Sequence, residues 1–317
     1  MEKTVRNGDE DKRRIFEELP VPQALRTMVI PTIISQIIVL IYNMADTFYV
    51  GRTNDPYMVA GVSLILPVFN ILICLAGLAG VGGGTLISRL MGEHRDDEAR
   101  RVSWFCLYIS AAMALAYALL MALFMEPLLL ALGASDSIYI YARQYVFCVI
   151  VLGAVPTVLS NVMSNLVRST GMSKEASIGI TLGGLLNIGL DPLFMFVLLP
   201  RGYEVLGVGI ATFLSNCCAC LYFFMVLYRS RKRTVVTFDM RSGIPSKNSI
   251  GSIFFVGIPA SITSLLFDLD YVIVDKLMVT YSEVALAAIG IVLKVERLPL
   301  NVGIGIGQGM MPLVAYN

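Results

Sequence analysis

Six acidic residues interrupt the long apolar runs of this sequence: Asp46, Asp191, Asp268, Asp270, Asp275 and Glu296. Inserting a charged side chain at the centre of a membrane helix costs about 2.5–3.5 kcal/mol on insertion scales, so such residues usually have a function. Asp46 lies in "LIYNMADTFYVGR" and Asp191 in "NIGLDPLFMF". Carboxylates in this setting can bind a cation or carry a proton, and both chemistries stay open.

The neighbours of the first two acids add further oxygen ligands. Asn187 lies four residues before Asp191, so their side chains share one face of a helix. Pro192 has no backbone N–H and leaves a nearby carbonyl without its helical partner. Asn43 lies three residues before Asp46 on the same face. Na⁺ prefers oxygen ligands, as Ca²⁺ does, so Asp46, Asn187 and Asp191 could hold Na⁺.

These residues lie in a strongly apolar chain. Its 317 residues are 56% hydrophobic and 15% charged, and the mean hydropathy is +0.75, whereas about a quarter of the residues of soluble domains are charged. A membrane helix needs about 20 apolar residues. This criterion predicts an all-α polytopic membrane protein with eight spans, at 24–50, 58–88, 101–125, 138–167, 174–199, 205–228, 250–275 and 284–315.

Loop charges predict the orientation of these spans, because Lys and Arg concentrate on the cytoplasmic side. The N-terminal tail and the loops after the second, fourth and sixth spans carry most of the basic residues, with Arg168 counted in the second of these loops. The alternate loops carry only Arg52, Arg201 and Lys276. We therefore expect a multi-pass protein of the cell membrane with a cytoplasmic N-terminus.

This orientation places several polar residues at one depth. Counted from the predicted cytosolic helix ends, Asp46, Asp191 and Asp268 lie about 27–30 Å deep at 1.5 Å per residue. Thr212 lies at a comparable depth in the sixth span. We expect these groups to form one polar level in the outer half of the bilayer. The alternative is that Asp46 and Asn187 only join helices, as buried polar side chains often do.

The chain contains an internal repeat. The first span, "IPTIISQIIVLIYNMADTFYVG", resembles the seventh, "IPASITSLLFDLDYVIVDKLMV", and the second resembles the eighth. Six spans separate the copies, so the repeat is parallel, as in some secondary transporters. We predict a cytosolic tail at 1–22, a six-helix lobe at 23–228, a basic linker at 229–249 and a partial second lobe at 250–317. Because the second copy has only two spans, we expect a C-terminal truncation.

The motifs together resemble the multidrug and toxic compound extrusion (MATE) family, within the superfamily that includes polysaccharide and lipid-precursor flippases. They include "ADTFYVGR", "GGGTLISRLMGE", "LVRSTGMSKEAS", "NIGLDPLFMF", "GVGIATFLSN" and "QGMMPLVAYN", and they extend from about residue 20 to the end. The resemblance implies twelve spans in two six-helix lobes around a central cavity, of which this chain has eight.

The resemblance also implies a function and site residues. It implies a multidrug antiporter that exports amphiphilic organic cations by alternating access, coupled to H⁺ or Na⁺, with Asp46, Asn187 and Asp191 as the cation-coupling residues. Thr212 is a weaker correspondence. We count Asp268, Asp270 and Glu296 as candidate cation or substrate groups of the second lobe, and Tyr42 and Asn43 as candidate cavity residues. The alternative is a flippase for a lipid-linked saccharide.

Other classes of function find little support. The single histidine, His94, lies in a polar loop, so no histidine-based metal site or catalytic triad can be assembled, and we expect no enzyme and no cofactor. A net charge of +1 gives no reason to expect nucleic acid. The expected partners are small organic cations and the lipid bilayer, and the sequence carries no indication of an oligomeric state.

Overall fold

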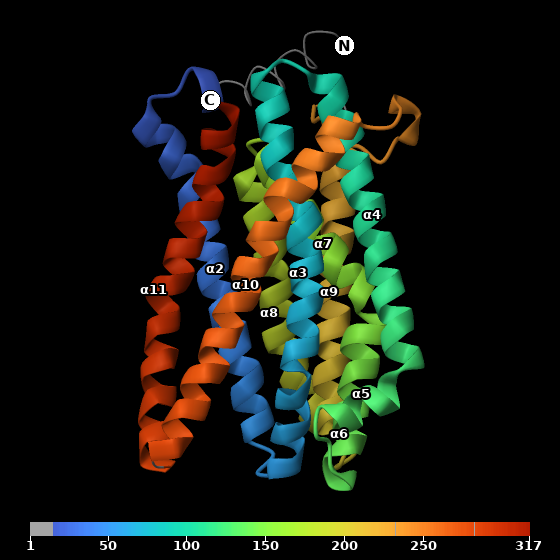
Figure 1. The fold of residues 1–317 in the computed structure, drawn as a ribbon, viewed down its shortest axis with the longest axis vertical. Helices are drawn as coiled ribbons and strands as arrows, with labels where there is room; N and C mark the ends of the chain where they lie inside the picture. Colours follow the sequence, from blue (N-terminus) through green and yellow to red (C-terminus); the bar gives the residue numbers. More distant parts are fainter. Residues whose placement is uncertain (1–14, 232, 282) are drawn as a thin grey trace.

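The computed structural model of the chain describes residues 15–231, 233–281 and 283–317, without the side chains of several residues between 268 and 294. Every regular element in these residues is a helix, and most run along one common direction (Figure 1). The α-helices are α2 (Val21–Gly51), α3 (Pro56–Gly92), α4 (Asp96–Leu123), α5 (Met125–Ala131), α6 (Asp136–Val146), α7 (Ala154–Ser169), α8 (Ser173–Leu193), α9 (Glu204–Ser230), α10 (Lys247–Tyr281) and α11 (Glu283–Tyr316).

Seven helices of the described chain are long and apolar enough to cross a membrane: α2, α3, α4, α8 with its π-helical extension Phe194–Leu198, α9, α10 and α11. The segments Asp136–Leu152 and Ala154–Ser169 are bent by 52° relative to each other and can form an eighth span. Each of these segments overlaps one of the eight predicted spans. The predicted all-α polytopic membrane fold is therefore confirmed.

The bend in the fourth span has a local cause. α6 passes into a π-helical segment, Phe147–Leu152, which ends at Gly153, and Pro156 follows in the first turn of α7. A proline is tolerated there because the first N–H groups of a helix have no helical partner. The bend lets α6 pack on α3 and α9, while α7 also reaches α4 and α8.

The glycine-rich part of α3 lets three helices approach it closely. A Cβ atom built at Gly80 would meet Asn165 and Val162 of α7, and one at Gly83 would meet the thiol of Cys106 on α4. A Cβ atom at Gly82 would collide with the backbone of α10. Small residues permit such approach of membrane helices, so these glycines place α3 at the centre of the bundle.

The repeated helices pack crosswise. α2 packs along α11 and α3 packs along α10 (Figure 1). Because α10 repeats α2 and α11 repeats α3 in sequence, these two contacts are equivalent in the repeat. Such an equivalence is what two copies related by an axis along the membrane normal would give. The division into lobes at 23–228 and 250–317 stays a prediction.

The linker between the copies is fastened to the start of α4. The Nε of Arg101 donates to the carbonyl of Ser242 at 2.8 Å, and the indole N–H of Trp104 donates to the carbonyl of Gly243 at 3.0 Å. The Glu98 carboxylate accepts from the backbone N–H of Ser246 at 2.8 Å and from the hydroxyl of Ser249 at 2.7 Å. The predicted basic linker therefore follows a defined path into α10.

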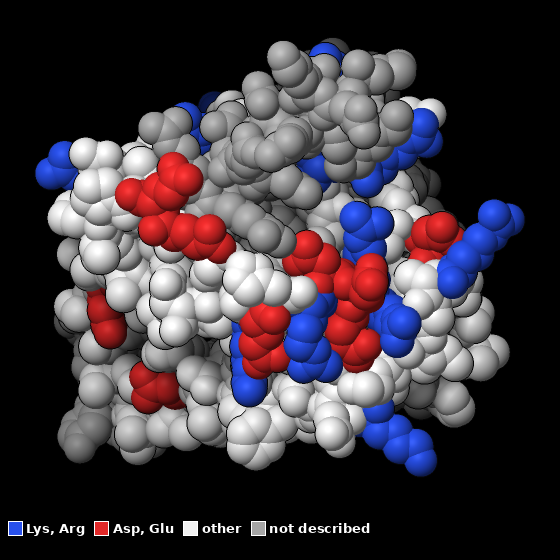
Figure 2. All heavy atoms as spheres, turned by 90° about the horizontal axis from the view of Figure 1, so that it is seen from above, with Lys and Arg blue, Asp and Glu red and all other residues white. Residues whose placement is uncertain are grey.

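Charged side chains gather at the end of the bundle that carries the linker and the C-terminus (Figure 2). Arg89 and Arg95 both pair with Glu93, at 3.0 and 2.9 Å, and together they lower the pKa of this carboxyl, Arg95 most strongly. Exposed pairs of this kind contribute about 0.2–1 kcal/mol each. They mark the end of the bundle that the loop charges assign to the cytosol.

The close contact between α3 and α10 gives a testable prediction. A Cβ atom at Gly257 would collide with the carbonyl of Leu78, whereas one at Gly251 on the same helix meets nothing within 4 Å. Gly257→Ala should therefore lower the melting temperature of the purified protein. The matched variant Gly251→Ala should leave it unchanged or raise it, because Ala is favoured over Gly in a helix by about 0.5–1 kcal/mol. Equal melting temperatures would contradict the packing described here.

Candidate functional site

Two acidic side chains from different helices meet between α2 and α8. Asp46 comes from α2 and is half-buried, and Asp191 comes from α8 and is fully buried. Gly184 allows the two helices to approach, since a Cβ atom there would lie 3.0 Å from the ring of Tyr42 and 3.1 Å from Ile38. The carboxyls of Asp46 and Asp191 lie within hydrogen-bonding reach of each other.

An amide and a hydroxyl extend this pair. The side-chain N–H of Asn187 donates to Asp191 Oδ1 at 3.3 Å and to the hydroxyl oxygen of Thr212, on α9, at 3.4 Å. Asn187 is 3% exposed. The structure therefore brings together Asp46, Asn187, Asp191 and Thr212, the four residues of the predicted cation-coupling set, from α2, α8 and α9. Their role in coupling stays a prediction.

The cluster holds more acceptors than donors. Asp46 Oδ1, Asn187 Oδ1 and Asp191 Oδ2 are buried oxygens without a hydrogen-bond partner in the part of the chain that the structure describes. Two ionised carboxylates cannot donate to each other, so a hydrogen bond between Asp46 and Asp191 requires a proton on one of them. An unpaired buried polar group is costly. A proton or a cation at this cluster would remove that cost.

Two tyrosines lie beside the carboxyls. Tyr42 on α2 lies close to Asp46. Tyr145 on α6 is 8% exposed and close enough to both Asp46 and Asp191 to interact with their charges. Tyr42 is a cavity candidate predicted from the sequence, whereas Tyr145 is not. No sequence signal could have found it, because a tyrosine in an apolar helix is common and only the packing of α6 brings this one to the acids.

The other candidates do not join the cluster. Asn43 is exposed, and its amide donates to the carbonyl of Val39 at 2.9 Å on its own helix. Asp270 on α10 and Glu296 on α11 are exposed. The side chain of Asp268 lies outside the described residues. The residues of the cluster therefore all lie in the first six spans. None of the described acidic side chains of the last two spans joins them.

A second polar cluster joins α2, α7 and α11 (Gln36, Arg168 and Gln308). The side-chain oxygen of Gln308 accepts from the Gln36 amide at 2.8 Å and from the Arg168 guanidinium at 3.2 Å. Arg168 is 1% exposed and makes no ion pair with any described residue. The loop charges predict a loop position for Arg168, and this is wrong: Arg168 lies inside α7, near the predicted cytosolic end.

The fold and the buried carboxyl cluster define a polytopic membrane protein with a candidate cation site. The family model described as MatE matches residues 31–193. The chain is 31% identical over 304 residues to the multidrug export protein MepA of Staphylococcus aureus strain NCTC 8325 / PS 47, and the match covers 95% of this chain and 66% of the relative.

Solved structures agree with this match. A multidrug resistance MATE family transporter of the MOP superfamily, in its outward-facing conformation, superposes with a TM-score of 0.83 at 27% identity, covering 91% of this chain and 63% of that one. MATE in complex with MaD3S gives a TM-score of 0.88 at 26% identity, covering 95% and 66%.

The chain therefore belongs to the MatE family, a family of transporters and not of enzymes. The predicted resemblance is confirmed. The chain spans 66% of the length of the curated relative.

The contact between Asn187 and Thr212 gives a second prediction. Thr212→Val keeps the size of the side chain but removes the acceptor, so it should destabilise the protein by roughly 1 kcal/mol and lower its melting temperature. Thr212→Ser keeps the oxygen and serves as the matched control, with a melting temperature closer to that of the parent. Equal melting temperatures of the Val and Ser variants would show that the hydroxyl makes no useful contact.

Proposed function

We propose that this protein is a cation-coupled antiporter that exports amphiphilic organic cations by alternating access. The observation that carries the proposal is the pair Asp46 and Asp191, two carboxyls from different helices within hydrogen-bonding reach. Asp191 is fully buried, and Oδ1 of the half-buried Asp46 is also shielded from solvent. A cation or proton that binds there is shared by α2 and α8. Its arrival and release therefore change how these helices hold together.

The carboxyl pair favours H⁺ over Na⁺ as the coupling ion. One proton suffices to turn the contact between Asp46 and Asp191 from repulsion into a hydrogen bond. Na⁺ would draw on the free oxygens of Asn187 and the two acids, and it remains the alternative within this proposal. Coupling follows because a ligand shifts a conformational equilibrium only when it binds the two states with different affinity.

The relatives support export of drugs as the direction and substrate class. MepA is named a multidrug export protein, and we extend that activity to this chain as part of the proposal. The acids at the site suit cationic cargo. A flippase for a lipid-linked saccharide is less well supported, because a pyrophosphate cargo calls for several basic cavity residues, whereas the described cluster is acidic. The predicted orientation, with a cytoplasmic N-terminus, belongs to the same proposal.

Substitution of the two acids tests the coupling role. Asp46→Asn and Asp191→Asn should each abolish efflux of a cationic dye from cells, because neither variant can take up the coupling ion, while the amount of protein in the membrane stays normal. Asp55→Asn is the matched control and should transport normally, since Asp55 caps α3 and Asn caps a helix as well as Asp. Normal efflux by both site variants would reject the coupling role.

The coupling ion is tested in vesicles that contain the purified protein. A pH gradient imposed across the vesicle membrane should drive dye transport. An Na⁺ gradient of the same size, imposed at constant pH, should not. The reverse result would assign Na⁺ to the Asp46 and Asp191 cluster.

The cluster of Gln36, Arg168 and Gln308 gives a prediction for the alternating movement, because it links α11 to α2 and α7 near the predicted cytosolic end. Thr85 of α3 lies at the same contact, with its hydroxyl 3.2 Å from the sulfur of Met311 on α11. Gln308→Leu removes both contacts of Gln308 and should speed the reaction of a cysteine introduced by Thr85→Cys with a membrane-impermeant maleimide added on the cytosolic side. Gln308→Glu would form an ion pair with Arg168, and it should slow this reaction and dye turnover together. Equal reaction rates in the two variants would contradict a gating role.

A further inference from the structure

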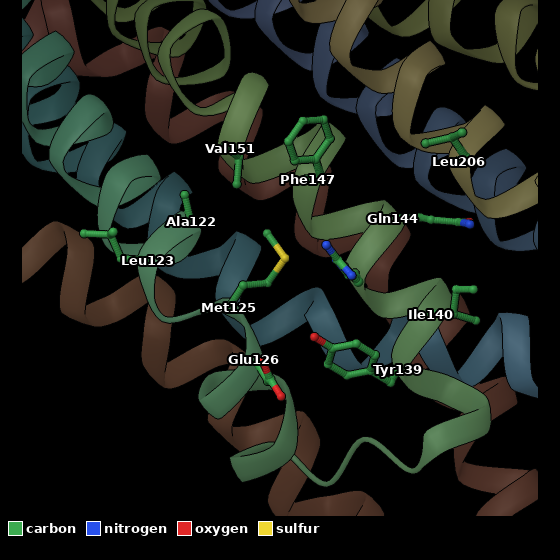
Figure 3. A pocket seen from close by; sticks show the side chains of 11 residues that line it. Ala122, Leu123, Met125, Glu126, Tyr139, Ile140, Gln144, Phe147, Val151 and Leu206 are labelled. Atoms are coloured by element: carbon green, nitrogen blue, oxygen red, sulfur yellow. The ribbon is translucent and has the colours of Figure 1, made fainter.

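A cavity of about 740 Å³ lies on a different side of α6 from the carboxyl cluster. It is lined by the end of α4, by α5 and by α6, and Leu206 of α9 also lines it (Figure 3). Gln144 lines this cavity, whereas the next residue, Tyr145, lies beside the two acids. Successive residues point about 100° apart on a helix, so the cavity and the cation cluster occupy different faces of α6.

The cavity has a polar end and an apolar end. Figure 3 shows Glu126 of α5 and Tyr139 of α6 at one end, with Ala122 and Val151 toward the other. Arg143 also lines the cavity, one helical turn beyond Tyr139. Glu126 and Arg143 are both exposed, and neither makes a hydrogen bond or an ion pair with any residue that the structure describes. The cavity therefore offers one anion and one cation together with an apolar wall.

The surroundings of the cavity face lipid. Leu123, Phe124 and Phe147 are 77%, 57% and 48% exposed, as expected for side chains in contact with acyl chains. α4 ends at Leu123, and α5 and α6 follow at the end of the bundle that the loop charges assign to the outside. The polar end of the cavity therefore lies at the level of the lipid headgroups, and the apolar end lies deeper.

We propose that this cavity binds a zwitterionic phospholipid of the outer leaflet, with a primary ammonium in its headgroup. The Arg143 guanidinium binds the lipid phosphate, a pairing that planar guanidinium groups make through two parallel hydrogen bonds. The Glu126 carboxylate accepts from the lipid ammonium, which has three N–H donors. One acyl chain lies along Phe147, Val151 and Leu206. The volume falls within the ~300–1,000 Å³ typical of small-molecule sites.

The two opposite charges of this cavity distinguish it from a binding site for the exported cation. Arg143 would repel an organic cation, whereas a headgroup with both charges matches Arg143 and Glu126 together. A lipid held here would fix α5 against α6 and so support the helix that carries Tyr145. The proposal stands without the antiporter function, because it concerns lipid retention and not transport.

Lipid retention by the purified protein tests the proposal. After exchange into detergent with a defined lipid added, native mass spectrometry should show several-fold more retained phosphatidylethanolamine than phosphatidylglycerol, and only the former should raise the melting temperature. Arg143→Gln should reduce retention of both lipids several-fold. Glu126→Gln should reduce only phosphatidylethanolamine, to the level of phosphatidylglycerol. Val151→Trp, which fills the apolar end, should abolish retention although both charges remain.

Matched controls are available at the same end of the bundle. Arg201→Gln and Asp136→Asn remove exposed charges that do not line the cavity, and both should retain lipid like the parent. Equal retention of the two lipids in the parent and in the Arg143 and Glu126 variants would overturn the proposal in favour of non-selective boundary lipid. Displacement of the lipid by a cationic dye whose binding depends on Glu126 would overturn it in favour of a drug site. The charge variants keep the test valid should Val151→Trp fail to fold.

Discussion

A membrane interior offers no water to satisfy polar groups, and the rest of this structure depends on that constraint. The backbone meets it by forming helices along almost the whole described chain. The side chains meet it only in part. Asp191 and Asn187 are buried and hydrogen-bonded to each other. Three oxygens of the cluster nevertheless have no hydrogen-bond partner within the described chain. This shortfall makes the cluster sensitive to the arrival of one positive charge.

The helices can bring such groups together only where their backbones approach closely. Gly184 lets α2 lie against α8 beside the carboxyl pair, and the glycines of α3 let α4, α7 and α10 meet at the centre of the bundle. The same approach at Gly305 and Gly309 brings α11 against Ile33 and Val29 of α2. Close packing therefore both builds the site and joins the two copies of the repeat.

The joint between the copies combines small residues with one buried charge. Arg168 is held by Gln308 across the contact and by Asn165 and Ser164 on its own helix, and its Nε has no partner in the described chain. A guanidinium in this position is costly to keep from water, so separation of the copies at this end would relieve it. The hydrogen bonds of Gln308 instead favour contact between the copies. A movement between two states needs opposing contributions of this kind.

The sequence by itself determined the fold class, the eight spans and the residues of the acidic cluster. Apolar runs of membrane length and rare intramembrane acids are local features of the sequence, so they can be recognised without knowing how the helices pack. The spacing of Asn187 and Asp191 even predicted their contact. Only the tertiary structure decided that Asn43 is exposed, that Tyr145 lies beside the acids and that Arg168 is buried between copies. These outcomes depend on which faces of distant helices meet, and side-chain contacts between distant segments leave no periodic mark in the sequence.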